Sequence, residues 1–223
     1  MLTLEELKDW FKDTQFIIFD SRICINNSIR LREITEDRDL RESELRMKEI
    51  YGFFNIHWFQ CKFISVIQLS KLFSDSRSQT QKRSFYKLFN RLQNEKYDKD
   101  LTELLKANSN RLGNSYSQRK DILLAINNAK AEIKQFKDTI DGINNLRNKI
   151  YAHTDPDSND AKNVVLTDTI ELQKLAEKIW NEFNGGLFGS VHSFEMTVDW
   201  HIGGIIETIA KDYKRMLDEC DEK

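Results

Sequence analysis

The sequence predicts an all-α protein, a bundle of long antiparallel helices with smaller helices at the N-terminal side. Three observations support this class. The chain of 223 residues contains one proline and eight glycines, so few residues would interrupt a helix. Apolar residues recur at intervals of three and four over most of the chain, which is the period of an amphipathic helix. Leu, Ile, Lys, Glu and Asn are abundant and favour helix over sheet.

Composition and charge narrow the classes of protein that the chain can represent. Apolar residues make up 39% and charged residues 31%, as in an ordinary soluble globular domain. The formal net charge of −2 argues against non-specific coating of nucleic acid, because such binding needs many Lys and Arg contacts to phosphate. The three cysteines, at 24, 61 and 220, are widely spaced, which indicates neither a disulfide framework nor a thiolate metal site.

The sequence carries no sign of export or of a membrane span. The first ten residues include acids and lack the basic start and apolar run of a signal peptide. Apolar runs stay far below the roughly 20 residues that cross a bilayer. We therefore expect a single cytoplasmic domain over 1–223 without membrane association, in which 1–40 form a candidate peripheral helical extension and 45–217 the main bundle.

Two helices are expected before residue 35. Thr3 and Glu6 have the spacing of a capping box at the start of a short amphipathic helix with Leu4, Leu7, Trp10 and Phe11. A second helix is predicted over 16–34, and its inward candidates are Phe16, Phe19, Ile23 and Ile34. The run 35–49 is dense in charges of both signs, which is typical of a solvated helix face or a connection.

The most apolar stretch, 45–73, is predicted to be one buried helix. Its aromatic stripe indicates core more strongly than a binding platform; the stripe includes Phe53, Phe54, Trp58, Phe59, Phe63 and Phe73. After a polar break at 74–80, a further helix is marked by Phe85, Leu88, Phe89 and Leu92, and a smaller one lies around 101–105. Residues 108–117, rich in Asn and Ser, predict a loop.

Three helices are expected in the remaining chain. The longest begins near Ser117 and ends close to Pro156, and its apolar seam includes Ile126, Ile133, Ile140, Ile143 and Leu146. The next has Thr167 or Asp168 as its cap, an inward face of Leu172, Leu175, Ile179, Trp180 and Phe183, and Gly185 and Gly186 at its end. The last is predicted over 190–217, with Gly203 and Gly204 as a close-packing point.

The stretch 142–156, G-I-N-N-L-R-N-K-I-Y-A-H-T-D-P, gathers the side chains best suited to chemistry. A neutral imidazole such as that of His153 can take the proton of a ribose 2′-hydroxyl or give one to a leaving oxygen. The guanidinium of Arg147 can stabilise the charge that builds on a phosphate, and Asn148 can orient either group by hydrogen bonding. These residue types are the ones needed to cleave RNA without a metal.

Spacing alone leaves alternatives open for this stretch. Six residues along a regular helix rotate by about 240°, which separates Arg147 from His153. The two side chains converge only if the helix frays or if two chains bring their helix ends together. Alternatively, Arg147 satisfies the helix C-terminus and His153 simply ends the helix, since the helix dipole favours both.

The string Arg147-Asn148-Lys149-Ile150-Tyr151-Ala152-His153, at the end of a long helix in an all-α chain, resembles the signature of the HEPN superfamily. In that signature an Arg, commonly followed by Asn or Asp, precedes a His by a few residues. Ala152 and the Thr154-Asp155 pair after the His look most like the branch that contains abortive-infection proteins of phage defence.

The resemblance implies a HEPN-like bundle that forms a homodimer and acts as a metal-independent endoribonuclease, in phage defence or as a toxin. Both chains would contribute Arg147 and His153 to one cleft as catalytic residues, with Asn148 in support. Lys149 and Tyr151 are candidate substrate-binding residues, RNA is the expected substrate, and no cofactor or metal is expected. A cognate antitoxin or regulatory protein is a further expected partner.

One feature of some toxin relatives is missing from the motif. Those relatives carry a Tyr two residues after the His, which a nucleotidyltransferase antitoxin modifies. This chain has Asp155 at that position. That form of regulation is therefore not expected here.

Two other functions remain open at this point. The chain can be a catalytically inactive HEPN-like module that binds RNA, a nucleotide or a protein partner, since fold does not fix function. It can also be a purely structural helical dimer.

Two further groups of side chains are interpreted without a function. The group Lys130, Lys134 and Lys137 predicts a solvated face more strongly than a phosphate-binding strip. The group His192, Glu195 and Asp199 shares one face of the predicted last helix and resembles half of a carboxylate-bridged metal site. No second half is found, so solvent exposure is the favoured interpretation.

Overall fold

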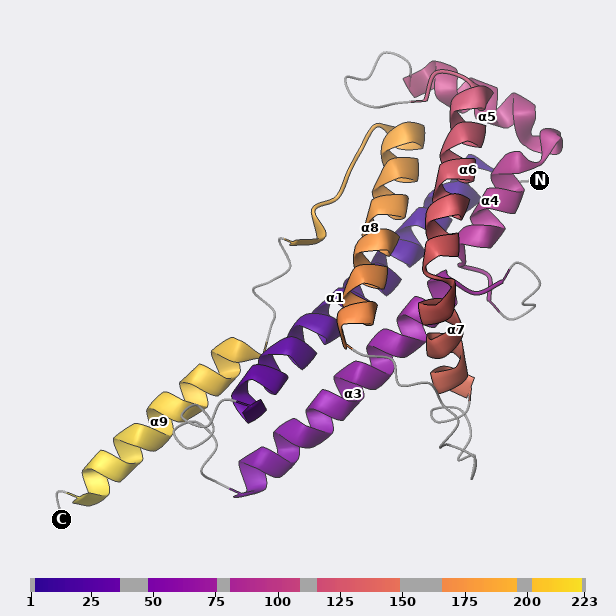
Figure 1. Ribbon diagram of the computed structural model, residues 1–223. Helices are drawn as coiled ribbons and strands as arrows, with labels where there is room; N and C mark the ends of the chain where they lie inside the picture. The colour runs from indigo at the N-terminus through magenta and orange to yellow at the C-terminus, as the bar shows by residue number, and fades with distance from the viewer. Residues whose placement is uncertain are drawn as a thin grey trace.

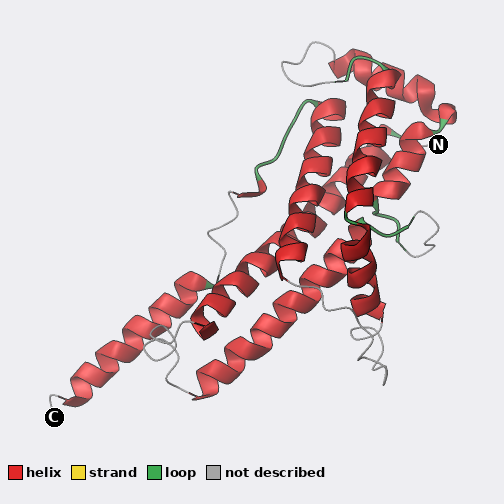
Figure 2. Ribbon diagram, viewed as in Figure 1, coloured by secondary structure: helices red, strands yellow, loops and turns green. Residues whose placement is uncertain are grey.

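The computed structural model of the protein describes residues 3–36, 48–75, 81–108, 116–148, 166–195 and 202–221. Within these ranges the regular structure is helical and no strand is present, which confirms the all-α fold class (Figures 1 and 2). The helices are α1 (Leu4–Glu36), α3 (Lys48–Leu72), α4 (Phe85–Gln93), α5 (Asp98–Asn108), α6 (Arg119–Gln135), α7 (Lys137–Leu146), α8 (Leu166–Phe188) and α9 (Gly203–Asp221). A single 3₁₀ turn (Glu95–Tyr97) precedes α5.

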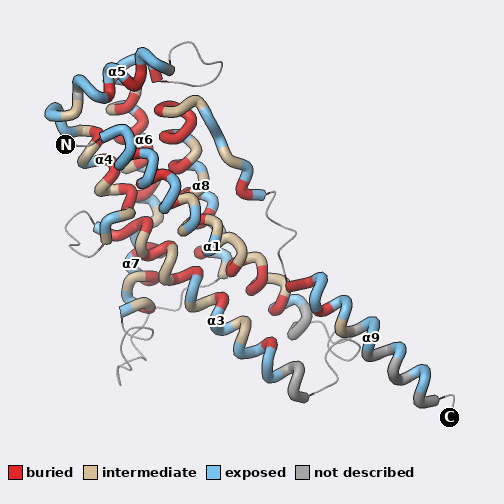
Figure 3. The backbone as a smooth tube through the Cα atoms, turned by 180° about the vertical axis from the view of Figure 1, so that it is seen from behind, coloured by how far each residue is buried: buried red, intermediate tan, exposed pale blue. Residues whose placement is uncertain are grey.

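The helices form a long bundle with one main core. Helices α1 and α3 run side by side, and α8 and α6 complete the body, while α9 extends away from it (Figure 1). Buried residues concentrate where α1, α4, α6 and α8 meet (Figure 3). Aromatic rings fill this core, among them Trp10, Phe11, Phe85, Phe89 and Phe183. A smaller separate core lies at the base of α9 and contains Leu31, Phe54, Ile202 and Ile206.

Helix α1 is continuous, so the prediction of two N-terminal helices was wrong. The capping box at its start is present, because Thr3 N–H donates to Glu6 at 3.0 Å and Glu6 N–H donates to Thr3 Oγ1 at 3.1 Å. At the expected break, the Thr14 hydroxyl donates to the Trp10 carbonyl at 2.7 Å, within the helix. No Gly or Pro interrupts this part of the chain, so the helix continues.

The inward face of α1 also differs from the prediction. Phe16 is 60% exposed, whereas the inward face combines aliphatic residues with small polar ones. The continuous helix sets one register for all of its turns, and this register buries Thr14, Ile18, Ser21, Ile25, Ser28 and Leu31.

Helix α3 forms where predicted, but its aromatic stripe is only partly core. Phe54, Leu69 and Phe73 are buried, whereas Phe53 is 64% and Phe59 is 52% exposed. The N-terminal half of α3 is apolar on several sides, and among the described residues neighbouring helices cover only one of them (Figure 3). Periodicity finds the helix but cannot tell which of its apolar faces has a partner.

The predicted long helix after Ser117 is two helices in the structure. Its start is confirmed, since Gln118 and Asp121 form a capping box at the N-terminus of α6. The chain then leaves helical geometry at Phe136, with φ −96° and ψ 15°, and α7 begins at the next residue. Phe136 packs against the main core, and neither Gly nor Pro marks the break in the sequence. The predicted end near Pro156 lies outside the described residues.

Helix α8 has the predicted inward face, but it does not end at Gly185 and Gly186. It continues to Phe188, and Gly189 ends it with a φ of +67°, the left-handed conformation that favours glycine. Gly186 instead provides space: a Cβ at this position would overlap the ring of Tyr116, whose backbone N–H donates to the Gly186 carbonyl at 2.8 Å.

The last helix starts later than predicted. Residues 190–193 form no regular secondary structure, a 3₁₀ turn covers 194–195, and α9 begins at Gly203. A Cβ at Gly204 would meet no atom within 4 Å, so this residue is not a close-packing point. The predicted start at residue 190 was wrong because the backbone of this segment forms hydrogen bonds with the Asn181 side chain of α8 in place of its own helical bonds.

Candidate functional site

Arg147 lies at the C-terminal end of α7, where the helix is anchored against the core. Ile140, Ile143 and Leu146 are buried and fix one face of α7, which packs against α3 and α8. At Arg147 and Asn148 the backbone forms a π-type turn. Such turns contain more residues than an α-helical turn and often occur at functional sites.

The guanidinium group of Arg147 is held by two polar side chains. Nε and Nη2 both donate to Asn148 Oδ1, at 3.0 and 2.9 Å. Nη1 donates to Ser70 Oγ on α3 at 3.3 Å. Ser70 Oγ in turn donates to the Ile67 carbonyl at 2.8 Å, which fixes the hydroxyl.

These contacts leave part of the guanidinium available. A guanidinium carries five N–H donors. With three of them engaged by Asn148 and Ser70, one N–H on Nη1 and one on Nη2 have no partner among the described residues. The group is half-buried, and it can present these donors to an anion such as a phosphate.

Two residues of this site were not predicted from the sequence. Ser70 lies 77 residues before Arg147, and no local pattern links the two. Asn144 lies one turn before Asn148, and its Oδ1 is buried without a hydrogen-bond partner among the described residues. The repeated amides of the motif, N-N-L-R-N, were the available signal for Asn144.

The second half of the motif lies outside the described residues. This holds for Lys149, Tyr151, Ala152, His153 and Asp155. The approach of Arg147 to His153, and the roles assigned to these residues, therefore stay predictions.

The three lysines before the motif do not form a phosphate-binding strip. Lys130 donates to Gln93 Oε1 at 2.8 Å, which ties α6 to the end of α4. Lys137 pairs with Asp141 at 2.7 Å, and this contact raises the pKa of the lysine. Lys134 is exposed. For Lys134 and Lys137 the predicted solvated face is confirmed.

The candidate half of a metal site is not formed as predicted. His192 lies in the non-helical segment after α8, where its backbone N–H donates to Asn181 Oδ1 at 2.8 Å. Its ring packs edge-on against Phe194, with the ring centroids 4.8 Å apart. Asp199 lies outside the described residues, and within the described part of the chain no three His, Cys, Asp or Glu side chains are grouped for a metal.

Two buried thiols form a separate polar contact between helices. Cys24 on α1 and Cys61 on α3 are both free and buried. Their hydrogen bond and their burial raise the pKa of Cys24 above its ordinary value. The Nε2 atom of His57 lies 3.6 Å from Cys61 Sγ. The hydrogen bond between the two thiols lowers the pKa of Cys61, so the two thiols shift in opposite directions. Both thiols are buried between α1 and α3.

No helix in the described part of the chain is long and apolar enough to cross a membrane.

The described helices and the Arg-Asn helix end fit the class that the motif resembles, the HEPN superfamily. A family model, HEPN_AbiU2, described as AbiU2, matches residues 4–203 and so includes the complete motif. The protein therefore belongs to the AbiU2 family of HEPN proteins, a family associated with abortive infection. No curated protein and no solved structure gives a significant match.

Proposed function

We propose that the protein is a metal-independent endoribonuclease of the HEPN type that acts in phage defence by abortive infection or as a toxin. The observation that carries the proposal is the Arg147 guanidinium, which Asn148 and Ser70 orient at a helix end while two of its N–H groups keep no described partner. An oriented cation of this kind can stabilise the charge on a phosphate in the transition state. Family membership supports the association with abortive infection.

In this proposal His153 supplies the proton transfers. Its imidazole takes the proton of the ribose 2′-hydroxyl, and the 2′-oxygen attacks the adjacent phosphorus. The bond from phosphorus to the 5′-oxygen breaks, and this oxygen receives a proton. The products are a 2′,3′-cyclic phosphate and a 5′-hydroxyl end. Arg147 holds the non-bridging oxygens as their charge increases.

A homodimer would complete the site. Two chains that bring the ends of α7 together place two copies of Arg147 and His153 in one cleft, so the Arg147 of one chain can act beside the His153 of the other. Lys149 and Tyr151 would bind the RNA backbone and a base. A cognate antitoxin or regulatory protein would control access to this cleft.

The proposal is tested with purified full-length protein and labelled single-stranded RNA in the presence of EDTA. We expect cleavage that gives cyclic-phosphate ends, and we expect Arg147→Ala and His153→Ala each to abolish it while the thermal melting curve is retained. Arg215, an exposed arginine on α9, provides the matched control, and Arg215→Ala should cleave at the parental rate.

Two results would contradict the proposal. Cleavage that persists in both Arg147→Ala and His153→Ala would assign the activity to other residues. Intact RNA with the parental protein, together with RNA or nucleotide binding, would favour the catalytically inactive HEPN-like module.

A further inference from the structure

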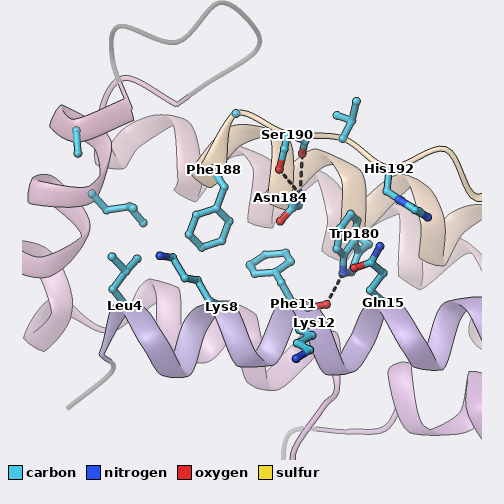
Figure 4. A pocket seen from close by; sticks show the side chains of 14 residues that line it. Leu4, Lys8, Phe11, Lys12, Gln15, Trp180, Asn184, Phe188, Ser190 and His192 are labelled. Atoms are coloured by element: carbon cyan, nitrogen blue, oxygen red, sulfur yellow. Dashed lines mark hydrogen bonds between the residues drawn. The ribbon is translucent and has the colours of Figure 1, made fainter.

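Two features of the described structure lie apart from Arg147. The first is a cavity of about 640 Å³ between the start of α1 and the end of α8. Lys8 and Lys12 both line it, but the side chain of Lys12 turns away from Lys8, so the lining brings no two cations together (Figure 4). The second is the pair of free thiols Cys24 and Cys61, where a sulfur nucleophile lies beside groups that can hold its proton. The thiol pair therefore offers the more defined chemistry.

The two thiols meet across the contact between α1 and α3, which run side by side (Figure 1). Cys24 is 8% and Cys61 is 2% exposed, and a hydrogen bond joins the two side chains. A disulfide requires the sulfur atoms to approach to about 2.05 Å. Two thiols that are already in hydrogen-bond contact reach this distance by rotation of their side chains and a small approach of the helices.

The groups around Cys61 favour its thiolate. The hydrogen bond from the Cys24 thiol lowers the pKa of Cys61, burial opposes this change, and a hydrogen bond from Asn27 lowers the pKa further. His57 lies one turn before Cys61 on α3, and its Nε2 atom is 3.6 Å from the sulfur. A neighbouring imidazole can accept the proton of a thiol and activate it as a nucleophile. Cys61 is therefore the thiol of this pair that reacts first.

Cys24 has the opposite surroundings and keeps its proton while Cys61 is ionised. The hydrogen bond to Cys61 and burial raise the pKa of Cys24, and the charges of Cys61 and Asp20 add to the effect. Oxidation of Cys61 to a sulfenic acid removes the charge on its sulfur. Cys24 then ionises more easily, and its sulfur lies beside the oxidised sulfur that it would attack.

His57 also connects the buried Cys61 to the surface of the protein. Its ring is half-buried and stacks on Phe53, with the ring centroids 6.3 Å apart and the planes at 6°. Phe53 itself is 64% exposed. A small oxidant that moves past the His57 ring therefore reaches Cys61, whereas a bulky reagent does not. Hydrogen peroxide, which is little larger than water, fits this requirement.

We propose that Cys24 and Cys61 are a reversible oxidation site, at which hydrogen peroxide produces a disulfide between α1 and α3. The Cys61 thiolate attacks one peroxide oxygen, the O–O bond breaks, and the departing hydroxide takes the proton held by His57 and leaves as water. The Cys24 thiolate then attacks the sulfenic sulfur, the S–O bond breaks, and the hydroxide leaves as water with the Cys24 proton. Two thiols are oxidised to one disulfide while one peroxide is reduced to two waters.

The test uses the full chain with Cys220→Ser, which leaves Cys24 and Cys61 as its two cysteines. The folded protein is treated with hydrogen peroxide, quenched with catalase, unfolded, alkylated with a maleimide and weighed by intact mass spectrometry. We expect both thiols to become unreactive together, with a mass lower by two hydrogen atoms, and dithiothreitol to restore both. Proteolysis without reductant should give one peptide pair that links Cys24 to Cys61.

Variants assign the order of the two steps. In Cys24→Ser the reaction should stop at a sulfenic acid on Cys61, which dimedone captures, whereas Cys61→Ser should leave Cys24 unmodified. His57→Phe keeps a flat ring beside Phe53 but removes the nitrogen, and it should slow disulfide formation by at least about tenfold. His192→Phe is the matched control, because its imidazole lies on the segment after α8, and it should react at the parental rate.

Three results would overturn the proposal. The first is a folded protein that keeps both thiols in peroxide and loses them only in urea. The second is a sulfenic acid on Cys24 in place of Cys61, and the third is an unchanged rate in His57→Phe. The proposed ribonuclease is tested separately, because Arg147→Ala should form the disulfide at the parental rate whether or not the protein cleaves RNA.

Discussion

At the scale of single residues, the contact between Tyr116 and Gly186 gives a sharp test of packing. Any Cβ at Gly186 would overlap the Tyr116 ring, which is held there by its backbone bond to Gly186 and by its hydroxyl at Glu182. We expect Gly186→Ala to lower the free energy of unfolding by about 1–3 kcal/mol, the usual cost of overpacking a core. Thermal melting measures this as a drop of about 2–4 °C per kcal/mol.

The control for this substitution is Gly52→Ala. Gly52 is an exposed residue within α3, and a Cβ there would meet nothing within 4 Å. Alanine is the better helix former, so Gly52→Ala should raise stability by about 0.5–1 kcal/mol. If Gly186→Ala and Gly52→Ala changed the melting temperature by the same amount, the overlap with the Tyr116 ring would not be the cause.

A second residue-scale prediction concerns the orientation of Arg147. Asn148→Ala removes the oxygen that accepts two of the Arg147 hydrogen bonds. Under the proposed function we expect kcat to fall by about 10- to 100-fold, since supporting residues typically contribute this much to positioning. Asn148→Asp keeps the acceptor oxygens and should restore most of kcat. If Asn148 only stabilised the fold, Asn148→Ala and Asn148→Asp would change the melting temperature equally and leave kcat unchanged.

At the scale of helices, a polar cluster joins α1 to α8. Arg22 Nη1 donates to both carboxylate oxygens of Glu177, at 2.9 and 3.0 Å, and the two side chains are 17% and 14% exposed. Gln173 Nε2 donates to Glu177 and to the Ile18 carbonyl. We expect Glu177→Ala to lower the free energy of unfolding, measured in urea, by about 1.5–3 kcal/mol, the usual contribution of hydrogen bonds to a charged group.

The neighbouring exposed pair on α8 provides the comparison. Glu171 pairs with Lys174 at 2.8 Å, and these side chains are 55% and 60% exposed. Water screens such a pair, so Glu171→Ala should cost less than about 1 kcal/mol. A loss for Glu171→Ala as large as that for Glu177→Ala would show that burial is not the deciding factor.

The start of α6 gives a prediction with a defined pH dependence. Asp121 accepts hydrogen bonds from the Ser117 hydroxyl and from the Ser117 and Gln118 N–H groups, and these contacts lower its pKa. A lowered folded-state pKa means that the ionised form stabilises the fold above the unfolded pKa of about 3.9, and that this stabilisation is lost as the pH falls further.

Asp121→Asn should therefore lower the melting temperature at pH 7, and the difference from the parental protein should shrink below about pH 4. Glu103→Gln, on the exposed side of α5, is the control for removal of an acid. A difference between Asp121→Asn and the parental protein that stays constant from pH 7 to pH 3 would contradict this assignment.

Helices were predictable from the sequence where apolar spacing was regular, as at α4 and on the inward face of α8. Their ends were less predictable, since the ends depend on distant contacts. The break at Phe136 and the continuation of α8 past Gly186 both follow from packing against side chains elsewhere in the chain. In the site, the adjacency of Arg147 and Asn148 was visible, whereas Ser70 was not, because tertiary structure alone brings it to Arg147.

At the scale of the whole molecule, the proposed shared cleft can be tested with mixed dimers. A heterodimer of one Arg147→Ala chain and one His153→Ala chain keeps one Arg147 and one His153 in the common cleft. We expect this heterodimer, purified through two different tags, to cleave RNA measurably while both mutant homodimers are inactive. A heterodimer as inactive as the homodimers would show that each chain uses only its own pair of residues.

The seam between α1 and α8 has a consequence for how the protein is made. The hydrogen bond from Trp180 to Phe11 joins residues that are 169 positions apart. A ribosome adds about 5–20 residues per second, so the face of α1 that α8 covers waits on the order of ten seconds for its partner. Translation that stops before α8 leaves Phe11 without Trp180 and yields a nascent chain with an uncovered apolar helix, a substrate for chaperones and proteases.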